Sequence, residues 1–217
     1  MLQIFKHIAF YIALPLLLSS CTTIRGIKEV SCHLADTINQ RDLRLASIYH
    51  STIGDRDTIC NTDRYLEEIG QLEIDTGIIY IRTVLDKEYN IESMYVYDDN
   101  RSLLYCWFRF IYDSENRYNS VPIGREYTFN SQGDITEIEN HEEGYSICHE
   151  QAMYIGDRYS KWKASKKLPE RALGRGIWHG KKIWKYHYTD RKRQRKMLVI
   201  DGCSGKILKK YDVLVTY

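Results

Sequence analysis

The sequence predicts an α+β fold, in which N-terminal helices and an antiparallel β-sheet are followed by a small unit made of a helix and a β-hairpin. Three observations predict it. Apolar residues recur at helical spacing from Ser31 to Tyr49, they alternate with polar residues from Ile78 onward, and a further helical pattern precedes strands near the C-terminus. The residues after position 20 suffice for one medium domain or two small ones.

Two helices are expected ahead of the sheet. The first covers residues 31–49, where four apolar side chains fall near one helical face: Leu34, Ile38, Leu45 and Ile48. The second covers residues 63–69, where Asp63 can cap the first turn and Gly70 can end the helix.

Five strands are expected next, over residues 78–85, 89–97, 103–112, 126–130 and 135–140. Tight turns between them favour antiparallel pairing. The strand 103–112 is apolar on both faces, since Cys106, Phe108 and Phe110 alternate with Leu103, Tyr105 and Trp107. We therefore expect it at the centre of the sheet and covered on both sides, with the N-terminal helix as a candidate cover.

A second unit is expected at the C-terminus. Ser146 is a candidate N-cap for a helix that runs to Tyr159, and a basic, irregular stretch follows it to Gly176. Strands are then expected over residues 183–188, 196–200 and 207–215. In the turn Asp201–Lys206, the carboxylate of Asp201 can accept hydrogen bonds from backbone amides, and Gly205 can adopt a positive φ.

The residues of this unit resemble the PepSY family of small envelope and secreted domains. The resemblance covers residues 145–213. It rests on H-E-Q-A at the start of the helix and on the hairpin V-I-D-x-x-S-G-K-I-L, which contains Asp201, Ser204, Gly205 and Lys206. The basic insert over residues 158–175 departs from the family pattern. It implies a domain that binds or restrains peptidases and other extracytoplasmic proteins without catalytic residues, and it makes Asp201, Ser204 and Gly205 turn-formers. Similar endings occur in NTF2-fold immunity proteins, which leaves that family open.

The N-terminus has the pattern of a secretory signal. Lys6 precedes an apolar segment, residues 8–18, that is too short to span a bilayer. Leu18-Ser19-Ser20-Cys21 then resembles the lipobox of bacterial lipoproteins. The resemblance implies cleavage before Cys21, covalent diacylglycerol on its thiol and acylation of its amino group, which together give stable membrane anchoring. Thr22 is not the Asp that commonly retains lipoproteins at the inner membrane, so we expect the outer membrane, facing the periplasm.

The predicted divisions follow from these patterns. They are a signal peptide over residues 1–20, a tether over residues 21–30, an acidic Tyr-rich α+β region over residues 31–144 and a basic PepSY-like domain over residues 145–217.

Five cysteines remain after Cys21, and their number is odd: Cys32, Cys60, Cys106, Cys148 and Cys203. No C-x-x-C pair occurs among them, which argues against a zinc knuckle or a thioredoxin-like motif. One or two disulfides with a thiol left over would fit an oxidising compartment, and the sequence leaves their connectivity open. Cys106 lies in an apolar run, where a buried thiol is expected.

Charge divides unevenly along the chain. Residues 21–157 hold 12 Lys and Arg against 25 Asp and Glu, whereas residues 158–217 hold 18 against 4. Such asymmetry predicts either a basic surface for an anionic partner or attraction between the halves. Anionic lipid and polysaccharide are the expected partners, and nucleic acid is not. The candidate patch consists of Arg171, Arg175, Arg191, Lys192, Arg193, Arg195 and Lys196.

Mutual repulsion within the run "RKRQRK" favours an exposed patch over burial. In the alternative, the arginines and lysines of the patch would pair with acids of the first half: Asp98, Asp99, Glu142 and Glu143.

No motif predicts catalysis, a metal site or a cofactor beyond the lipid on Cys21. Ser160–Lys163 matches S-x-x-K without its companion motifs, and the histidines show no ligand spacing. The sequence therefore predicts a membrane-anchored, non-enzymatic protein-binding or inhibitory lipoprotein. The alternatives are an immunity protein against a periplasm-delivered toxin and a structural or glycan-binding envelope component.

Overall fold

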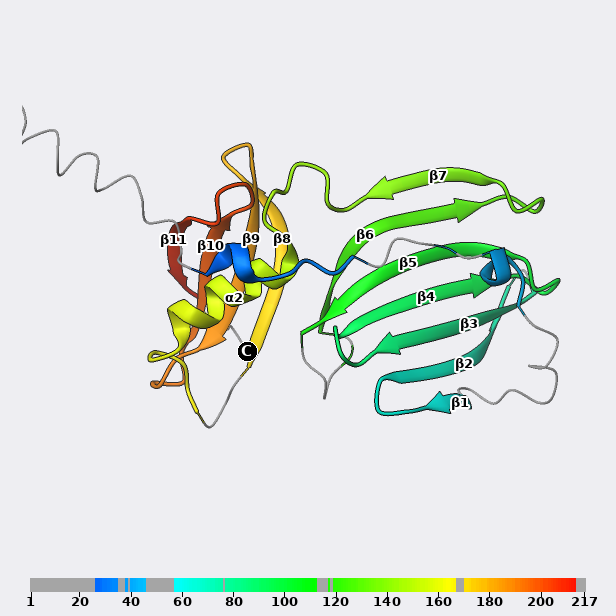
Figure 1. The fold of residues 1–217 in the computed structure, drawn as a ribbon, viewed down its shortest axis with the longest axis horizontal. Coiled ribbons are helices and arrows are strands. Elements are labelled where there is room, and N and C mark those ends of the chain that lie inside the picture. The colour runs from blue at the N-terminus through cyan, green and yellow to red at the C-terminus, as the bar shows by residue number, and fades with distance from the viewer. Residues whose placement is uncertain are drawn as a thin grey trace, which may run out of the picture.

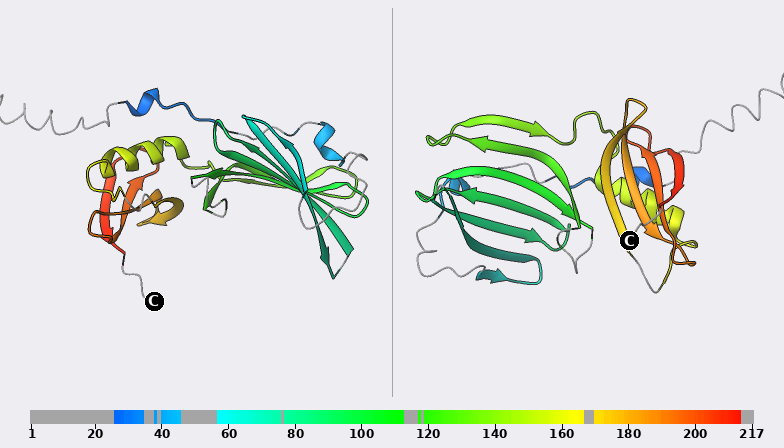
Figure 2. Two further views of the ribbon diagram at one scale, coloured as in Figure 1. Left: turned by 90° about the horizontal axis from the view of Figure 1, so that it is seen from below. Right: turned by 180° about the vertical axis from the view of Figure 1, so that it is seen from behind.

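The computed structural model describes residues 26–34, 38, 40–45, 57–75, 77–112, 117, 119–166 and 170–213. The predicted signal peptide, the lipobox and Cys21 lie outside these residues. The described chain is mostly β, with eleven strands in two antiparallel sheets and one α-helix (Figures 1 and 2). No helix within the described ranges is both long enough and apolar enough to cross a membrane.

The larger sheet is a meander of seven strands in the order of the sequence, and every neighbouring pair is antiparallel. Short connections explain this order, because a strand that turns back at once pairs with its predecessor. The strands are β1 (Asp57–Asn61), β2 (Tyr65–Ile74), β3 (Gly77–Asp86), β4 (Ile91–Tyr97), β5 (Leu103–Ile111), β6 (Ser120–Phe129) and β7 (Ile135–Asn140).

One face of the larger sheet carries its core. Period-two alternation places Tyr95, Cys106 and Phe108 on this face, and all three are buried. The short 3-10 helix η2 (Gln40–Leu43) and the residues after it lie against the sheet, where the backbone N–H of Leu45 donates to the carbonyl of Arg101.

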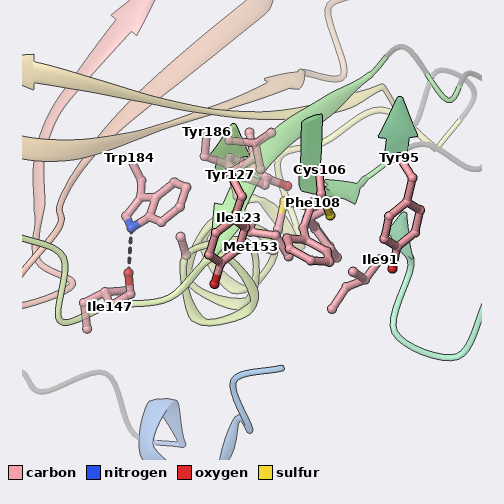
Figure 3. Packing of buried hydrophobic residues seen from close by; sticks show 14 of the residues in the cluster. Ile91, Tyr95, Cys106, Phe108, Ile123, Tyr127, Ile147, Met153, Trp184 and Tyr186 are labelled. Carbon is pink, nitrogen blue, oxygen red and sulfur yellow. Dashed lines mark hydrogen bonds between the residues drawn. The ribbon is translucent and has the colours of Figure 1, made fainter. Parts of the chain in front are cut away.

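The smaller sheet has the strand order β11-β10-β9-β8 and is covered on one face by α2 (His149–Ser160). Its core is aromatic, because Trp184, Tyr186 and Tyr188 are all buried. The indole N–H of Trp184 donates to the carbonyl of Ile147 at 2.8 Å (Figure 3). The strands are β8 (Arg171–Trp178), β9 (Lys181–Thr189), β10 (Arg195–Asp201) and β11 (Ile207–Asp212).

The two sheets share one continuous hydrophobic cluster. In Figure 3 it extends from Tyr95 and Phe108 of the larger sheet to Met153 on α2 and Trp184 on β9. The junction is also polar, since Arg175 on β8 forms an ion pair with Glu142, which follows β7. The predicted division between residues 144 and 145 falls in the segment that joins β7 to α2.

A segment that we call the strap, residues 26–34, runs from α2 to the larger sheet. It begins with the 3-10 helix η1 (Ile27–Glu29), which packs against α2, although the sequence predicted a tether here. The amide of Gln151 donates to the carbonyls of Ile27 and Val30, and Cys32 forms a disulfide with Cys148.

The predicted fold class is therefore wrong. Residues 31–34 are irregular and residues 40–43 form a 3-10 helix, so the described part of the predicted helix 31–49 is not α-helical; the rest lies outside the described residues. The predicted helix 63–69 is part of strand β2. The C-terminal unit has four strands after its helix, because the stretch predicted as irregular contains β8, so it is not the predicted helix-plus-hairpin PepSY-like unit.

Two details of the predicted sheet also change. Strand β5 is fifth of seven and is covered on one face only, since Tyr105 on the other face is 42% exposed. The N-cap of α2 is Cys148 and not Ser146.

Candidate binding site

A cleft of about 440 Å³ lies between the strap and one end of the larger sheet. Tyr65 opens β2, Val84 lies near the end of β3, and Tyr89 lies in the turn that leads to β4, so the meander brings them to the same end of the sheet. The complete lining is Cys32, His33, Leu34, Tyr65, Val84, Asp86, Tyr89, Ile91 and Ser93.

The strap is held in place at this cleft by three independent contacts. The disulfide joins Cys32 to the N-cap of α2. The backbone N–H of His33 donates to Glu150 Oε2 at 2.7 Å, and His33 Nδ1 lies 2.6 Å from Glu150 Oε1. The imidazole of His33 also stacks on the ring of Tyr89, with centroids 3.9 Å apart. One wall of the cleft is therefore fixed to both α2 and the larger sheet.

The opposite wall is aromatic and carries one organised ion pair. The guanidinium of Arg64 lies 5.0 Å from the ring centroid of Tyr65 and 5.6 Å from that of Tyr89. Its Nη2 is 3.2 Å from Asp86 Oδ2, while Asp86 Oδ1 accepts the backbone N–H of Glu88. The ion pair with Asp86 holds the Arg64 guanidinium near both tyrosine rings, where cation–π contact is favourable.

The cleft offers contacts suited to binding. Val84, Ile91 and Leu34 supply aliphatic surface, the tyrosines supply ring faces, and Ser93 and Asp86 supply polar groups. A mostly apolar hollow with a few polar groups is the usual form of a ligand site. Cys32 is oxidised, so its sulfur is not a free nucleophile.

Two buried ion-pair networks stabilise the sheet that carries the cleft. On the core face, Arg82 donates to Asp42 at 2.9 Å and to Glu67 at 2.7 Å. Burial alone would lower the pKa of Arg82, but its hydrogen bonds to these carboxylates outweigh that effect and raise it. Burial raises the pKa of the adjacent Tyr97 to about 12. On the opposite face, the fully buried Glu92 pairs with Arg109 and Arg117, and Arg117 also contacts Glu68.

A buried histidine lies where the two sheets meet. His149, the first residue of α2, is fully buried against Phe110 at a centroid distance of 4.7 Å. Neither ring nitrogen has a hydrogen-bond partner among the described residues. Burial, followed by the nearby charges of Arg175 and His33, lowers the pKa of His149 to about 3, so the ring is neutral at physiological pH.

The predicted turn residues lie together between β10 and β11. Asp201 Oδ1 accepts the backbone N–H groups of Cys203 and Ser204, at 3.1 and 2.7 Å, and the Ser204 hydroxyl at 2.8 Å. These hydrogen bonds lower the pKa of Asp201 despite its partial burial. Gly205 has a φ of +69°, and a Cβ there would lie 3.0 Å from Ile155 Cδ1. Their geometry is that of a structural turn.

The seven residues of the predicted basic patch do not lie on one face. Arg175 is largely buried, pairs with Glu142 and lies over the rings of Tyr145 and Trp184. Lys196 is buried beside Asp190 and Asp212. Arg171 pairs with Asp157 on α2. Arg195 and the three cations of the β9–β10 turn are exposed: Arg191, Lys192 and Arg193.

Two groups of side chains have spacings compatible with metal ligands. In one, two of the three members are the disulfide partners Cys32 and Cys148. In the other, Glu126, Glu139 and His141 lie at the sheet edge formed by β7, where clusters of exposed acidic groups are common without an ion. We assign no metal to either.

Sequence reasoning did not identify the cleft. The signals in the chain were the odd cysteine count and the neighbouring His33, but nothing in the sequence joins residues 32–34 to Glu150 or Tyr89. Comparison of the chain with family models, with curated proteins and with solved structures gave no match.

Proposed function

We propose that this protein is a lipid-anchored lipoprotein of the bacterial cell envelope that acts as a non-enzymatic binding module for another envelope protein. Residues 18–21 support the anchor, since they match the lipobox at all four positions. The Cys32–Cys148 disulfide supports an exported chain, because disulfides persist in oxidising compartments such as the periplasm. Thr22 after the lipidated cysteine favours the outer membrane, facing the periplasm.

The fixed strap beside the cleft is the observation that carries the binding function. The disulfide, the contacts of Glu150 and the stack on Tyr89 hold His33 and the adjacent Leu34 in place before any ligand arrives. A preformed wall lowers the entropy lost on binding. Leu34 is nevertheless 46% exposed, which leaves an apolar side chain available at the mouth of the cleft.

The chemistry of the cleft favours an apolar or aromatic side chain of a partner protein. Such a group would pack on Val84 and Ile91 and between the tyrosine rings, while its backbone would find hydrogen-bonding partners in Ser93 and Asp86. Anchoring residues of this kind, inserted in a pocket, dominate many protein–protein contacts.

Site-specific photo-cross-linking in intact cells tests this proposal. A photoreactive amino acid at Leu34 should cross-link one envelope protein, whereas the same amino acid at Leu72 should not, because Leu72 is similarly exposed (50%) but lies toward the other end of β2, away from the cleft. Tyr89→Ala should abolish the cross-link by removing the stacking surface. Equal labelling from both positions, or none from Leu34, would contradict the binding function.

The anchor is tested separately. Cys21→Ala should leave the chain out of the membrane fraction or as an uncleaved precursor, without the added mass of acyl chains. Unchanged fractionation of this variant would contradict the lipoprotein assignment while leaving the cleft result valid.

A further inference from the structure

The C-terminal end of α2 and the β9–β10 turn come together at one end of the smaller sheet (Figures 1 and 2). The backbone N–H of Arg191 donates to the carbonyl of Lys163 at 3.0 Å, and Ala164 forms a β-bridge with Asp190. Two segments that are separated in the sequence are therefore joined by backbone hydrogen bonds. We call their six exposed side chains the basic tip: Lys161, Trp162, Lys163, Arg191, Lys192 and Arg193.

The charges of the basic tip are not neutralised by nearby acids. None of its five cations forms an ion pair with a carboxylate among the described residues. Asp190, the acid of the same turn, accepts the backbone N–H groups of Lys192 and Gln194 and lies 3.6 Å from the ammonium of Lys196. The tip therefore presents uncompensated positive charge to solvent, which attracts an anionic surface.

An exposed tryptophan lies within this charge. Trp162 is 73% exposed, the highest value of any large apolar side chain described, and the ammonium of Lys161 lies 5.5 Å from its ring centroid. Indole rings concentrate at membrane–water interfaces, where the ring meets apolar surface and the N–H stays hydrated. Lysines beside such a ring can extend their ammonium groups to lipid phosphates.

The tip also lies close to the start of the described chain. Gly26 packs on Tyr154, where a Cβ would lie 2.8 Å from the tyrosine oxygen. From Tyr154, α2 runs on for about 9 Å to Ser160, at 1.5 Å per residue, and Trp162 follows. Cys21 is five residues before Gly26, so at most about 18 Å of chain separates them.

We propose that the basic tip docks on the anionic surface of the membrane that carries the anchor, with Trp162 inserted among the lipid headgroups. This inference rests on the proposed lipid anchor, which keeps the membrane within reach of the tip. Docking gives the smaller sheet a fixed side toward the bilayer, while the cleft lies near the opposite, N-terminal end of α2, where the strap meets the larger sheet.

Binding to vesicles tests the tip without the anchor. The purified chain from Thr22 onward retains every described residue and lacks the acylated cysteine. It should co-sediment with vesicles that contain about 30% anionic phospholipid and not with neutral phosphatidylcholine vesicles. Tryptophan emission should shift to shorter wavelength on binding. Equal binding to neutral vesicles, or none to anionic ones, would overturn the proposal.

Charge-matched variants locate the contact. Arg191→Gln with Lys192→Gln should weaken vesicle binding roughly 25-fold, at about fivefold per cation. Lys181→Gln with Lys182→Gln removes the same charge from the opposite end of β9, about 27 Å away at 3.4 Å per residue, and should leave affinity within about twofold. Equal loss in both double variants would mean that net charge, and not the tip, governs binding.

The tryptophan is tested in the same way. Trp162→Ser should weaken binding about tenfold, as expected for roughly 60 Å² of apolar surface, and abolish the emission shift. Ile177→Ser removes an apolar side chain of similar exposure (69%) near the opposite end of the sheet and should have no effect.

If soluble heparin binds the chain while anionic vesicles do not, the partner is a polysaccharide and the membrane proposal fails. Because the vesicle assay lacks the anchor, its failure is distinct from a failure of Cys21→Ala.

Discussion

The two sheets hold their charges in opposite ways. In the larger sheet, cations and carboxylates lie together on both faces, with Arg82 between Asp42 and Glu67, and Glu92 between two arginines. In the smaller sheet the core is aromatic, and most cations extend from the surface. The charge split along the chain is therefore not cancelled by mutual attraction of the halves. Arg175–Glu142 and Arg171–Asp157 join them, whereas the cations of the basic tip form no ion pair among the described residues.

The buried ion pairs of the larger sheet and the exposed cations of the basic tip should therefore contribute to different properties, the first to stability and the second to association. Ion pairs inside the larger sheet are shielded from solvent, so losing one partner leaves the other buried and unpaired. Cations at the tip remain hydrated, so their loss should affect association and leave folding almost unchanged.

Glu92→Gln should destabilise the larger sheet strongly. The side chain of Glu92 is fully buried, and its loss leaves the guanidinium groups of Arg109 and Arg117 without that charge. We expect the free energy of unfolding, measured by urea denaturation, to fall by about 3–5 kcal/mol. Glu137→Gln, on the exposed strand β7, should change it by less than about 0.5 kcal/mol. Similar small effects of both substitutions would mean that the buried network contributes little.

Acid should act on the junction between the sheets through His149. Its pKa is lowered to about 3 in the folded chain and is near 6.5 when unfolded, so the unfolded chain binds more protons between these values. Stability is then fully present above pH 6.5 and should fall by about 3 kcal/mol by pH 4.

His149→Phe supplies the control for this acid effect. The ring can still pack on Phe110, and the two unpartnered nitrogens are removed. The part of the pH dependence that comes from His149 should disappear in this variant. Identical pH profiles of stability for the two proteins would show that His149 is not the responsible group.

Gly156→Ala tests how closely α2 packs on the smaller sheet. A Cβ at Gly156 would lie 2.2 Å from the ring of Tyr186, so α2 would have to shift. We expect a loss of about 1–3 kcal/mol in thermal or urea unfolding, although alanine favours a helix over glycine by about 1 kcal/mol. Gly174→Ala, where nothing lies within 4 Å, should be nearly neutral. Stabilisation by Gly156→Ala would contradict the close approach.

The sequence predicted the regular parts of this fold and missed those that depend on distant partners. Strands β3, β4, β5, β7, β9 and β10 follow clear period-two patterns. Strand β2 was predicted to contain a helix over residues 63–69 because Asp63 could cap a first turn and Gly70 could end it, and Glu67 interrupts the inward face of the strand. That glutamate forms an ion pair with Arg82 on the neighbouring strand, a contact that the local sequence pattern does not reveal.

Strand β8 was also missed because a charged residue occupies an inward-facing position of the strand. Its two arginines and two glycines gave no apolar alternation, yet Arg175 points inward onto the rings of Tyr145 and Trp184.

The cleft depends on the disulfide between Cys32 and Cys148, which are separated by 116 residues, and no local pattern specifies that pairing. By contrast, the turn at Asp201 and Gly205 follows from residues within one short segment.

A salt titration with two readouts separates the buried charges of the larger sheet from the exposed cations of the basic tip. Unfolding free energy and affinity for anionic vesicles would be measured in one buffer series from about 0.05 M to about 0.5 M NaCl, which shortens the Debye length about threefold. If the larger sheet keeps its charges inside and the tip keeps its cations outside, unfolding free energy should change by less than about 1 kcal/mol while vesicle affinity falls at least tenfold. A fold that loses stability with salt while vesicle binding stays constant would show that the ion pairs hold the two sheets together and that the basic tip does not bind the membrane.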